Sequence, residues 1–379
     1  MKRIIYFLAA ALFLWGAICF MPEIKAEDKK AKDTFCTALC ENSSGTLISG
    51  NNENVHVPQG YLPKLMTVLL TAEAIEEGKF SSDDTITVGS EAENAAGAVV
   101  WLTAGEKITV DELLKSVIIG NAGDAALTLA VNVAGDEESF VDMMNARAFE
   151  LGMRNTVYRS CGGKDDPSEY TTASDMGKLA GELLKHTELR KYFTAWIDRV
   201  RGGQTEVVNE NRLVRDYEGV TGLKACHSEL SGCALILSAE RDGNSFTAVI
   251  LGCDDEDERF KTGKQMLAAA FSSYKVTTPD FSNEFIRPVT VHGGVEKSVM
   301  VGAGDISELV VPKSGGELSA AVMIPEYVDA PVKKGQKVGC IGFYNGKTLL
   351  YETDLVALAE VEKRGFWSSI AKCLIVLYK

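Results

Sequence analysis

The sequence lacks an excess of positive charge. Its 379 residues carry 53 acidic and 39 basic side chains, which gives a formal net charge of -14 at pH 7. A surface of this sign repels nucleic acid and anionic lipid, so we expect no nucleic-acid partner for the main body of the chain. The acidity is interpreted as that of an ordinary solvated surface.

Cysteine and histidine are not clustered in the way that metal sites require. The chain has nine cysteines and four histidines, but no C-x-x-C pair and no group of these residues with ligand spacing. Cys226 and His227 are neighbours, and two residues do not make a site. We therefore expect no metal and no cofactor. Disulfides stay open for an exported chain, although Cys233 and Cys253 lie in apolar runs typical of small core residues.

Internal repeats and low-complexity tracts are also absent. Hydrophobic residues make up 46% and charged residues 24% of the chain, as in ordinary globular proteins. The length suffices for roughly two domains, each with a core of its own.

The first 26 residues have the pattern of a signal peptide. Lys2 and Arg3 precede the apolar run "IIYFLAAALFLWGAICF", and Ala26 offers a small residue for cleavage. The run is about as long as a short membrane span, so an uncleaved anchor is the alternative. A polar stretch follows at once, which favours cleavage. The pattern predicts an exported protein whose body lies outside the cytoplasmic membrane.

Helical and strand patterns predict an α+β domain over residues 27–275. We expect a hairpin around the Ser-Ser-Gly turn at 43–45 and two strands joined by the Asp-Gly-Asn turn at 242–244. Pro63 suits the first position of a helix, and Gly135 suits a C-cap. The expected helices cover residues 63–78, 111–119, 124–134, 138–152, 171–186 and 257–274.

Beyond a linker that begins near residue 276, the pattern changes. Residues 285–360 alternate as short strands broken by Gly, Pro and Asp, which predicts a small all-β sandwich domain over residues 276–360, linker included. Residues 361–379 place apolar side chains at helical spacing, with Trp367 and Tyr378 near the ends. The apolar run is too short to span a bilayer, so we predict an amphipathic helix at the membrane surface. A helix that docks on its own protein is the alternative.

Six stretches of the chain resemble one family, the low-molecular-mass penicillin-binding proteins, which are serine-type D-alanyl-D-alanine carboxypeptidases. They keep the order and spacing of that family, and they cover residues 38–60, 63–74, 124–163, 170–184, 209–224 and 238–253. The resemblance implies a penicillin-binding, transpeptidase-like (β-lactamase-like) domain followed by the β domain and the terminal amphipathic helix. It also implies a role in peptidoglycan metabolism at the outer face of the cytoplasmic membrane.

The family's chemistry rests on three motifs. The serine of S-x-x-K attacks the D-Ala-D-Ala amide or a β-lactam, and its lysine helps to transfer protons. The S-x-N motif helps to move protons and to hold the substrate. The K-T-G motif lies on an edge strand, where its lysine binds the terminal carboxylate of the substrate.

The first motif has lost its serine. "YLPK" places Tyr61 at the position of the nucleophile and keeps Lys64. A phenol has a pKa near 10, about three units above neutral pH, and the ring fills space that a substrate carbonyl must enter. We do not expect Tyr61 to replace the serine.

The other two motifs are altered as well. In "NAGDAA", Asn121 replaces the serine and Gly123 replaces the asparagine, while Asp124 keeps what we interpret as a structural role. In the third motif Lys224 is kept, but Ala225 and Cys226 replace Thr and Gly. Four-residue patterns such as Ser272-x-x-Lys275 arise by chance and lie outside the expected cleft.

Three of these positions allow alternative interpretations. Lys64 and Lys224 either line a basic cleft for an anionic ligand such as a peptide carboxylate, or remain as hydrogen-bonded residues without a ligand. Cys226 lies near Lys224 and His227, and a nearby cation lowers the pKa of a thiol. A reactive thiol is therefore one hypothesis, and a buried or crowding side chain is the other.

We therefore expect a pseudoenzyme, exported and peripheral on the outer face of the cytoplasmic membrane. It would bind peptidoglycan stem peptide or an envelope protein without forming an acyl-enzyme, because three catalytic motifs are altered at once. The first alternative is residual serine-type carboxypeptidase activity. The second is a purely structural envelope module with a closed cleft.

Overall fold

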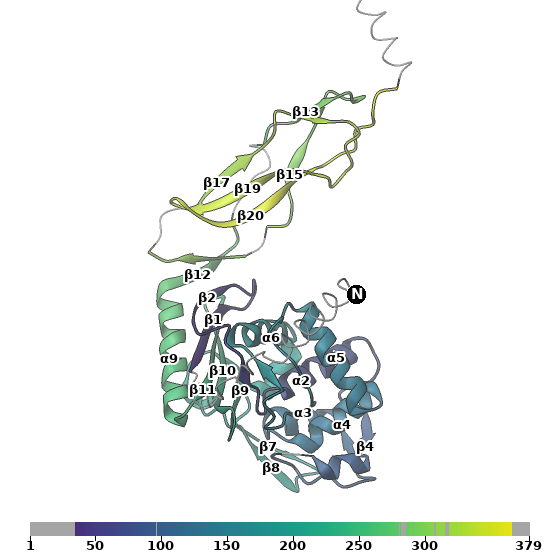
Figure 1. Ribbon diagram of the computed structural model, residues 1–379, viewed down its shortest axis with the longest axis vertical. Coiled ribbons are helices and arrows are strands. Elements are labelled where there is room, and N and C mark those ends of the chain that lie inside the picture. Colours follow the sequence, from purple (N-terminus) through teal and green to yellow (C-terminus); the bar gives the residue numbers. More distant parts are fainter. Residues whose placement is uncertain are drawn as a thin grey trace, which may run out of the picture.

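The computed structural model describes residues 35–95, 97–279, 281, 286–306, 308–314 and 318–365. The predicted signal peptide and residues 366–379 of the predicted terminal helix lie outside these residues. Figure 1 shows an α+β domain and, beyond the long helix α9, an elongated domain made of strands alone.

The sheet of the α+β domain has five strands, and the two predicted hairpins form four of them. Its order is β2-β1-β11-β10-β9, and each neighbouring pair is antiparallel. Asp242 and Gly243 join β10 to β11 with φ angles of 50° and 74°, as a two-residue hairpin turn of type I′ requires. The strands are β1 (Cys36–Glu41), β2 (Leu47–Asn51), β9 (Val220–Ser228), β10 (Gly232–Arg241) and β11 (Asn244–Cys253).

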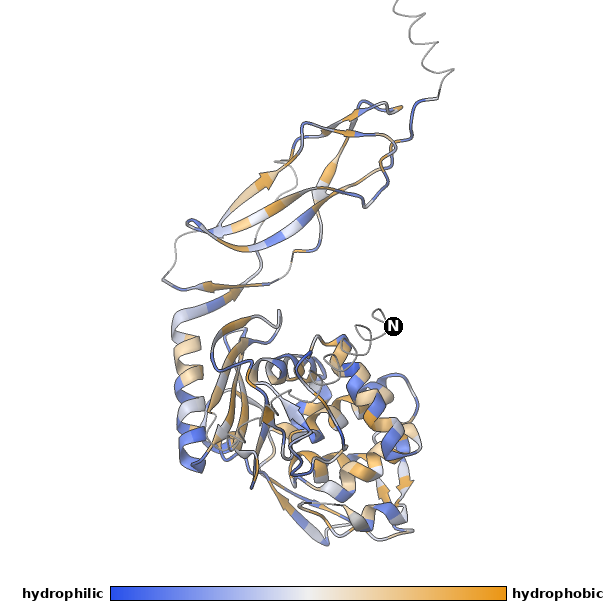
Figure 2. Cartoon of the chain, in the orientation of Figure 1, coloured by the Kyte–Doolittle hydropathy of each residue, from blue (hydrophilic) through white to orange (hydrophobic). Residues whose placement is uncertain are grey.

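The two faces of this sheet are covered by different helices. Along β10, Leu235 and Leu237 pack in the hydrophobic cluster that contains α9 (Glu256–Ser273), while Ala234 and Ile236 pack in the cluster of the other helices. This alternation follows from the two-residue period of a strand. The sheet therefore separates the α9 layer from the helical layer that carries the candidate site (Figure 2).

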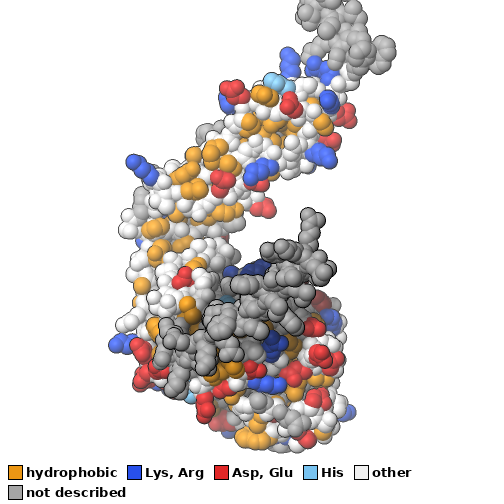
Figure 3. Space-filling model, in the orientation of Figure 1, with side chains coloured by type: hydrophobic (Ala, Val, Ile, Leu, Met, Phe, Trp, Pro, Cys, Tyr) orange, Lys and Arg blue, Asp and Glu red, His pale blue; other side chains and the backbone are white. Residues whose placement is uncertain are grey.

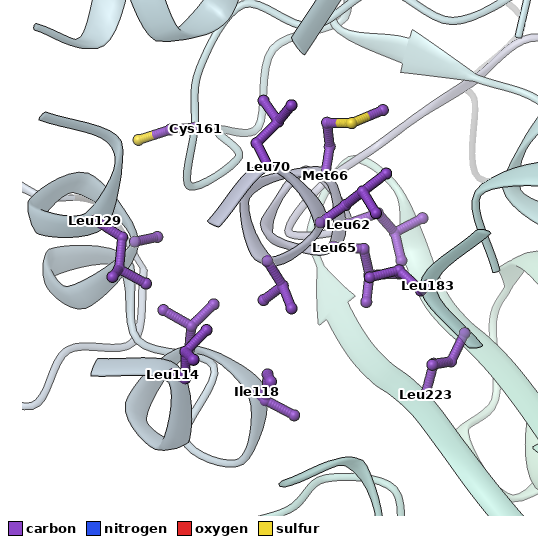
Figure 4. Close-up of a cluster of buried hydrophobic side chains, with 14 of the residues drawn as sticks. Leu62, Leu65, Met66, Leu70, Leu114, Ile118, Leu129, Cys161, Leu183 and Leu223 are labelled. Carbon is purple, nitrogen blue, oxygen red and sulfur yellow. The ribbon is translucent and has the colours of Figure 1, made fainter. Parts of the chain in front are cut away.

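Helix α2 (Lys64–Glu76) lies in the middle of the helical layer. Ten of its 13 residues are buried, and Figure 4 shows its leucines among those of neighbouring elements. Pro63 is the N-cap of α2 and not its first residue, so the helix begins one residue later than predicted. Gly135, with a φ of 94°, ends α4 as predicted. The helices around it are α3 (Val110–Ile118), α4 (Gly123–Ala134), α5 (Glu137–Glu150) and α6 (Ala173–Lys185).

Short elements, which the sequence patterns did not predict, connect these helices and strands. They are β3 (Val57–Pro58), β4 (Thr85–Thr87), η2 (Ser90–Asn94), β5 (Lys107–Thr109), β6 (Tyr170–Thr171), η3 (Thr187–Leu189), α7 (Arg190–Phe193), β7 (Ile197–Val200), β8 (Thr205–Val208) and α8 (Leu213–Asp216).

The second domain contains only strands in its described residues, as predicted. A four-stranded sheet of order β15-β20-β19-β17 and a three-stranded sheet of order β14-β13-β18 enclose a separate hydrophobic cluster. The strands are β12 (Tyr274–Thr277), β13 (Val289–His292), β14 (Ser298–Val299), β15 (Val301–Ala303), β16 (Leu309–Pro312), β17 (Leu318–Met323), β18 (Tyr327–Asp329), β19 (Lys337–Asn345) and β20 (Thr348–Ala357).

The junction between the domains is a continuous structure. β12 follows α9 directly and pairs with β16, so the predicted boundary between residues 275 and 276 falls inside a strand. Figure 3 shows apolar patches together with charges of both signs on the visible face of the second domain.

The start of the predicted terminal helix is extended instead. Val361 forms a β-bridge with Val332, and Lys363 forms one with Gly294. These pairings hold residues 361–363 against the second domain, so any helix begins later than predicted. Among the described residues, no helix has both the length and the apolar character needed to cross a bilayer.

Candidate functional site

Three elements bring the altered motif positions together. Tyr61 and Lys64 lie at the start of α2, Asn121 and Gly123 at the start of α4, and Lys224 on the edge strand β9. Lys224 Nζ donates to Asn121 Oδ1 at 2.7 Å, and the two lysines line the same small cavity. The structure thus assembles these residues in one place.

The ring of Tyr61 lies between Lys64 and Gly97. Its ring centroid lies 4.6 Å from Lys64 Nζ, and its edge rests on the backbone of Gly97, where a Cβ atom would come within 2.7 Å of Tyr61 Cε1. Burial and the nearby Asp165 raise the pKa of the phenol further above its ordinary value. The hydroxyl therefore stays protonated at neutral pH and is a poor nucleophile.

Lys64 is buried beneath that ring, with 1% of its surface exposed. Its ammonium donates to the carbonyl oxygen of Gly162 at 2.5 Å. Burial, followed by the charge of Lys224, lowers the pKa of Lys64 to about 7. Since a carbonyl is neutral, this hydrogen bond does not offset the loss of hydration of the charged amine.

Lys224 is held in a short polar chain. It is 4% exposed, and Asn121, which accepts its hydrogen bond, donates in turn to Glu210 Oε1 at 2.9 Å. Burial lowers the pKa of Lys224. Asn121 has a φ of 54°, a left-handed conformation that asparagine tolerates better than most residues. The side chain of Asn121 is therefore the direct hydrogen-bond partner of Lys224.

Gly123 and Asp124 form hydrogen bonds to backbone groups of the loop at 98–102. Gly123 brings no side chain to the site, and its N–H donates to the carbonyl of Ala98 at 2.7 Å. Asp124 Oδ2 accepts from the N–H groups of Val100 and Leu102 at 3.1 and 3.0 Å. The structural role that we predicted for Asp124 is thus visible in its contacts.

The two substitutions on β9 face opposite sides of the sheet. Ala225 pairs with Leu235 and packs in the α9 cluster, while Cys226 pairs with Ala234 on the face of the helical layer. Cys226 is fully buried, and burial raises the pKa of its thiol to about 11. A thiol with this pKa is protonated at neutral pH, so the structure favours a buried side chain over a reactive one.

The cavity between the two lysines is about 10 Å³ in volume. This is roughly the space of a single water molecule. Apolar side chains of α2, α3, α7 and β9 form the rest of its wall, and Figure 4 shows three of them, Leu65, Ile118 and Leu223. A cavity of this size is too small for a peptide, so a peptide can reach the lysines only after neighbouring side chains have moved.

Several contact residues escaped the sequence analysis. Gly97, Gly162 and Glu210 touch the site only because loops distant in sequence meet there, and no local pattern signals this. Two buried serines, Ser228 and Ser231, lie against Gly60 beside Tyr61. Among the described contacts their hydroxyls bond each other at 2.6 Å, and neither bonds Lys64 or Lys224.

One trio of side chains has the geometry to hold a metal ion. The ligand atoms of Glu76, His186 and Glu188 lie within 4.8 Å of one another, and His186 Nδ1 is 2.9 Å from Glu76 Oε1. The trio lies at the far end of α2, about 18 Å along the helix from Lys64. It is not part of the candidate site, and exposed carboxylates near a histidine often form ordinary ion pairs.

Comparison with known proteins places this geometry in a family. Residues 24–255 match the D-alanyl-D-alanine carboxypeptidases of peptidase family S11, and residues 274–363 match the C-terminal domain of penicillin-binding protein 5. The D-alanyl-D-alanine carboxypeptidase DacF of Bacillus subtilis is 28% identical over 97% of this chain and 96% of its own length. The carboxypeptidase DacC of Escherichia coli is 30% identical over 96% of this chain and 92% of its own.

A solved structure agrees with these matches in fold. Penicillin-binding protein 5 from Haemophilus influenzae superposes with a TM-score of 0.80 at 24% identity, over 86% of this chain and 97% of that one. The resemblance noted from the sequence is thereby confirmed for both domains. The chain belongs to the D-alanyl-D-alanine carboxypeptidase family S11, whose members act in peptidoglycan metabolism outside the cytoplasm.

Proposed function

We propose that this protein is a non-catalytic member of its family, which binds a peptidoglycan stem peptide and does not cleave it. The observation that carries the proposal is Tyr61, which stands at the position of the nucleophile with its ring 4.6 Å from Lys64 Nζ. The protein would act at the outer face of the cytoplasmic membrane, through the signal peptide and the terminal helix predicted from its sequence.

Acyl transfer needs an activated hydroxyl beside a base and a lysine that is free to bind the substrate carboxylate. The phenol of Tyr61 has a raised pKa, and Asn121 occupies Lys224. Gly123 supplies no polar side chain at the asparagine position of the S-x-N motif. Each change removes a different step of the reaction, which supports the loss of acyl-enzyme chemistry as a whole.

Binding is supported by the two buried lysines. Lys64 bonds a carbonyl and Lys224 bonds a side-chain amide, so both cations have neutral partners in direct contact. A buried charge without an opposite charge is costly, and a carboxylate ligand would offset that cost. The carboxylate that ends a stem peptide has this charge, and it would reach Lys224 once Tyr61 and Asn121 rotate away.

The test is calorimetric titration of the exported protein with a synthetic stem pentapeptide that ends in D-Ala-D-Ala. We expect one peptide to bind per chain without release of D-alanine. Lys224→Met should weaken binding by tenfold or more, since charged hydrogen bonds contribute about 1.5–3 kcal/mol. Tyr61→Ala should strengthen it. The matched control is Lys337→Met, which removes an exposed lysine of the second domain that pairs with Asp354.

Release of D-alanine by the wild-type protein would contradict the proposal and favour residual activity. If neither wild type nor Tyr61→Ala binds the peptide, the purely structural module becomes the better account. The small cavity between the lysines is the observation in favour of that second candidate.

A further inference from the structure

Trp101 is the most exposed large apolar side chain of the described residues, at 69% of its surface. Its φ is 59°, in the left-handed region, where a bulky residue is a genuine outlier. Backbone strain of this kind persists only where the surroundings impose it, and it gathers at functional sites. The residue therefore calls for an explanation beyond chance exposure.

The surroundings do impose this conformation. Asp124 Oδ2 accepts hydrogen bonds from Val100 N and Leu102 N, the residues on either side of Trp101. Arg201 donates to the carbonyl of Val100 at 3.1 Å. Val100 and Leu102 are buried, so the loop is anchored at both sides and the ring between them is held out in solvent.

A cavity of about 220 Å³ lies beside the ring, lined by Trp101, Ala92, Glu93, Val99, Leu102 and Thr103 and reaching Asp124. It is much larger than the space of about 10 Å³ between the lysines. It is also smaller than the roughly 300 Å³ at which sites for drug-sized ligands begin. The space suits a single ring stacked on the indole.

The charges around this cavity disfavour an anionic ligand. None of its described lining residues is a lysine or arginine, and two, Glu93 and Asp124, are acidic. Both carboxylates are hydrogen-bonded to the backbone, because Asp124 accepts three N–H groups and Glu93 Oε1 accepts from Ala104 N at 3.0 Å. The cavity therefore offers the aromatic face of Trp101 with polar atoms at its edge. A neutral ring fits this lining, because its C–H face can stack on the indole while its hydroxyl groups meet the polar atoms.

The cavity lies next to the candidate cleft. Gly97, on the same loop, supports the ring of Tyr61, and Gly123 binds the carbonyl of Ala98. In peptidoglycan the stem peptide is attached covalently to a strand of N-acetylated sugars. A sugar platform one short loop away from a peptide cleft has the layout that this polymer requires.

We propose that Trp101 is the platform of a second binding site, which stacks a pyranose ring of the peptidoglycan glycan strand. The inference rests on the proposed binding of peptidoglycan, and it adds the sugar as a ligand class with a site of its own. Its probe is a sugar without peptide, so the two proposals can fail separately.

The experiment titrates the exported protein with the tetramer of β-1,4-linked N-acetylglucosamine, followed by tryptophan fluorescence and calorimetry. We expect saturable binding that Trp101→Ala weakens by about tenfold, which lies within the roughly 5- to 150-fold that stacking of one nucleobase on an aromatic side chain contributes. Trp101→Phe should retain most of the affinity. Phe149→Ala removes another exposed aromatic side chain, 65% exposed on α5, and should leave binding unchanged.

Circular dichroism establishes that each variant is folded, and the stem pentapeptide should bind to Trp101→Ala as it binds to wild type. The inference is overturned if the wild type does not bind the tetramer, or if Trp101→Ala binds it equally well. It is also overturned if the site instead binds a quaternary ammonium such as choline, since a cation above the indole would then explain the exposed ring.

Discussion

Tyr61, at the position that we aligned with the family's nucleophile, has consequences for its neighbours. The ring needs the space above Gly97, and the glycine is required there twice, for its φ of 79° and for the absence of a Cβ atom. The substitution and the glycine contact thus form one unit. The sequence reveals the tyrosine, but only the fold reveals what the ring touches.

Gly97→Ala tests this unit. We expect it to destabilise the protein by about 1–2 kcal/mol, because alanine resists a left-handed backbone and its Cβ would meet the Tyr61 ring. When Tyr61 is replaced by alanine, the clash with the ring disappears and only the backbone cost remains. The loss of unfolding free energy in the double variant should therefore be smaller than the sum of the two single losses by roughly 0.5–1 kcal/mol, as measured by urea denaturation. Strictly additive effects would contradict the packing of the ring on Gly97.

Lys64 makes stability depend on pH. Its pKa is about 7 in the fold, below the ordinary lysine value of 10.5, so the unfolded chain binds more protons between these pH values. The free energy of unfolding should therefore gain a contribution as pH rises from about 7 towards 10.5, with a slope of at most about 1.4 kcal/mol per pH unit. Below pH 7 the buried charge costs its full amount.

Lys64→Met should remove this contribution. The difference in unfolding free energy between the variant and wild type should favour the variant most at pH 6 and least at pH 10. Denaturant melts of both proteins across that range measure it, and taking the difference cancels the cysteines that titrate there. A constant difference would mean that Lys64 keeps an ordinary pKa.

The same titration should govern ligand binding. A carboxylate bound beside Lys64 favours the protonated amine, so binding takes up a proton when the free lysine is neutral. Affinity for the stem pentapeptide should therefore fall as pH rises above about 7, as measured by calorimetry at several pH values. An affinity that does not change between pH 6 and 9 would show that the peptide carboxylate does not contact this lysine.

At the scale of elements, Asp124 in the first turn of α4 holds the loop at 99–103 through hydrogen bonds to Val100 N and Leu102 N. Asp124→Asn keeps the shape of the side chain but places an amide N–H among backbone donors. We expect a loss of about 1–3 kcal/mol in denaturation, the cost of leaving a buried donor unsatisfied. Asp136→Asn is the matched control, because Asp136 is an exposed N-cap of α5 and asparagine caps a helix equally well.

Long elements follow from sequence far better than short ones. Helices α2 to α6 begin within about two residues of their predicted starts, because long apolar patterns mark them. A side-chain cap marks three of them as well, at Thr109, Asp136 and Thr172. The pair β3–β6 is missed because it joins residues 57–58 to residues 170–171, and no local pattern predicts that contact. The hairpin β7–β8 had a usable signal in Gly202 and Gly203, which lie between its strands.

At the scale of the whole molecule, the two domains have separate cores. The clusters of the α+β domain and the cluster of the second domain share no residue, and the junction depends on β12, which pairs with β16. Composition and turn signals predicted the change from helices to strands. They placed the boundary inside β12, because a four-residue strand that continues from a helix has no signal of its own.

Residues 35–277 should therefore fold on their own. We expect a cooperative thermal transition within a few degrees of the one that this domain shows in the full protein, together with unchanged affinity for the stem pentapeptide. Differential scanning calorimetry and titration measure both. A fragment without a cooperative transition would show that the second domain is part of the same folding unit.

The central claim is that the site cannot form an acyl-enzyme. The most direct measurement is incubation of the protein with a fluorescent penicillin, followed by denaturing electrophoresis, with a relative that has serine at the first motif in parallel. We predict a labelled band for that relative and none for this protein or for its Tyr61→Ala variant. A stoichiometric covalent adduct on the wild-type protein would contradict the account.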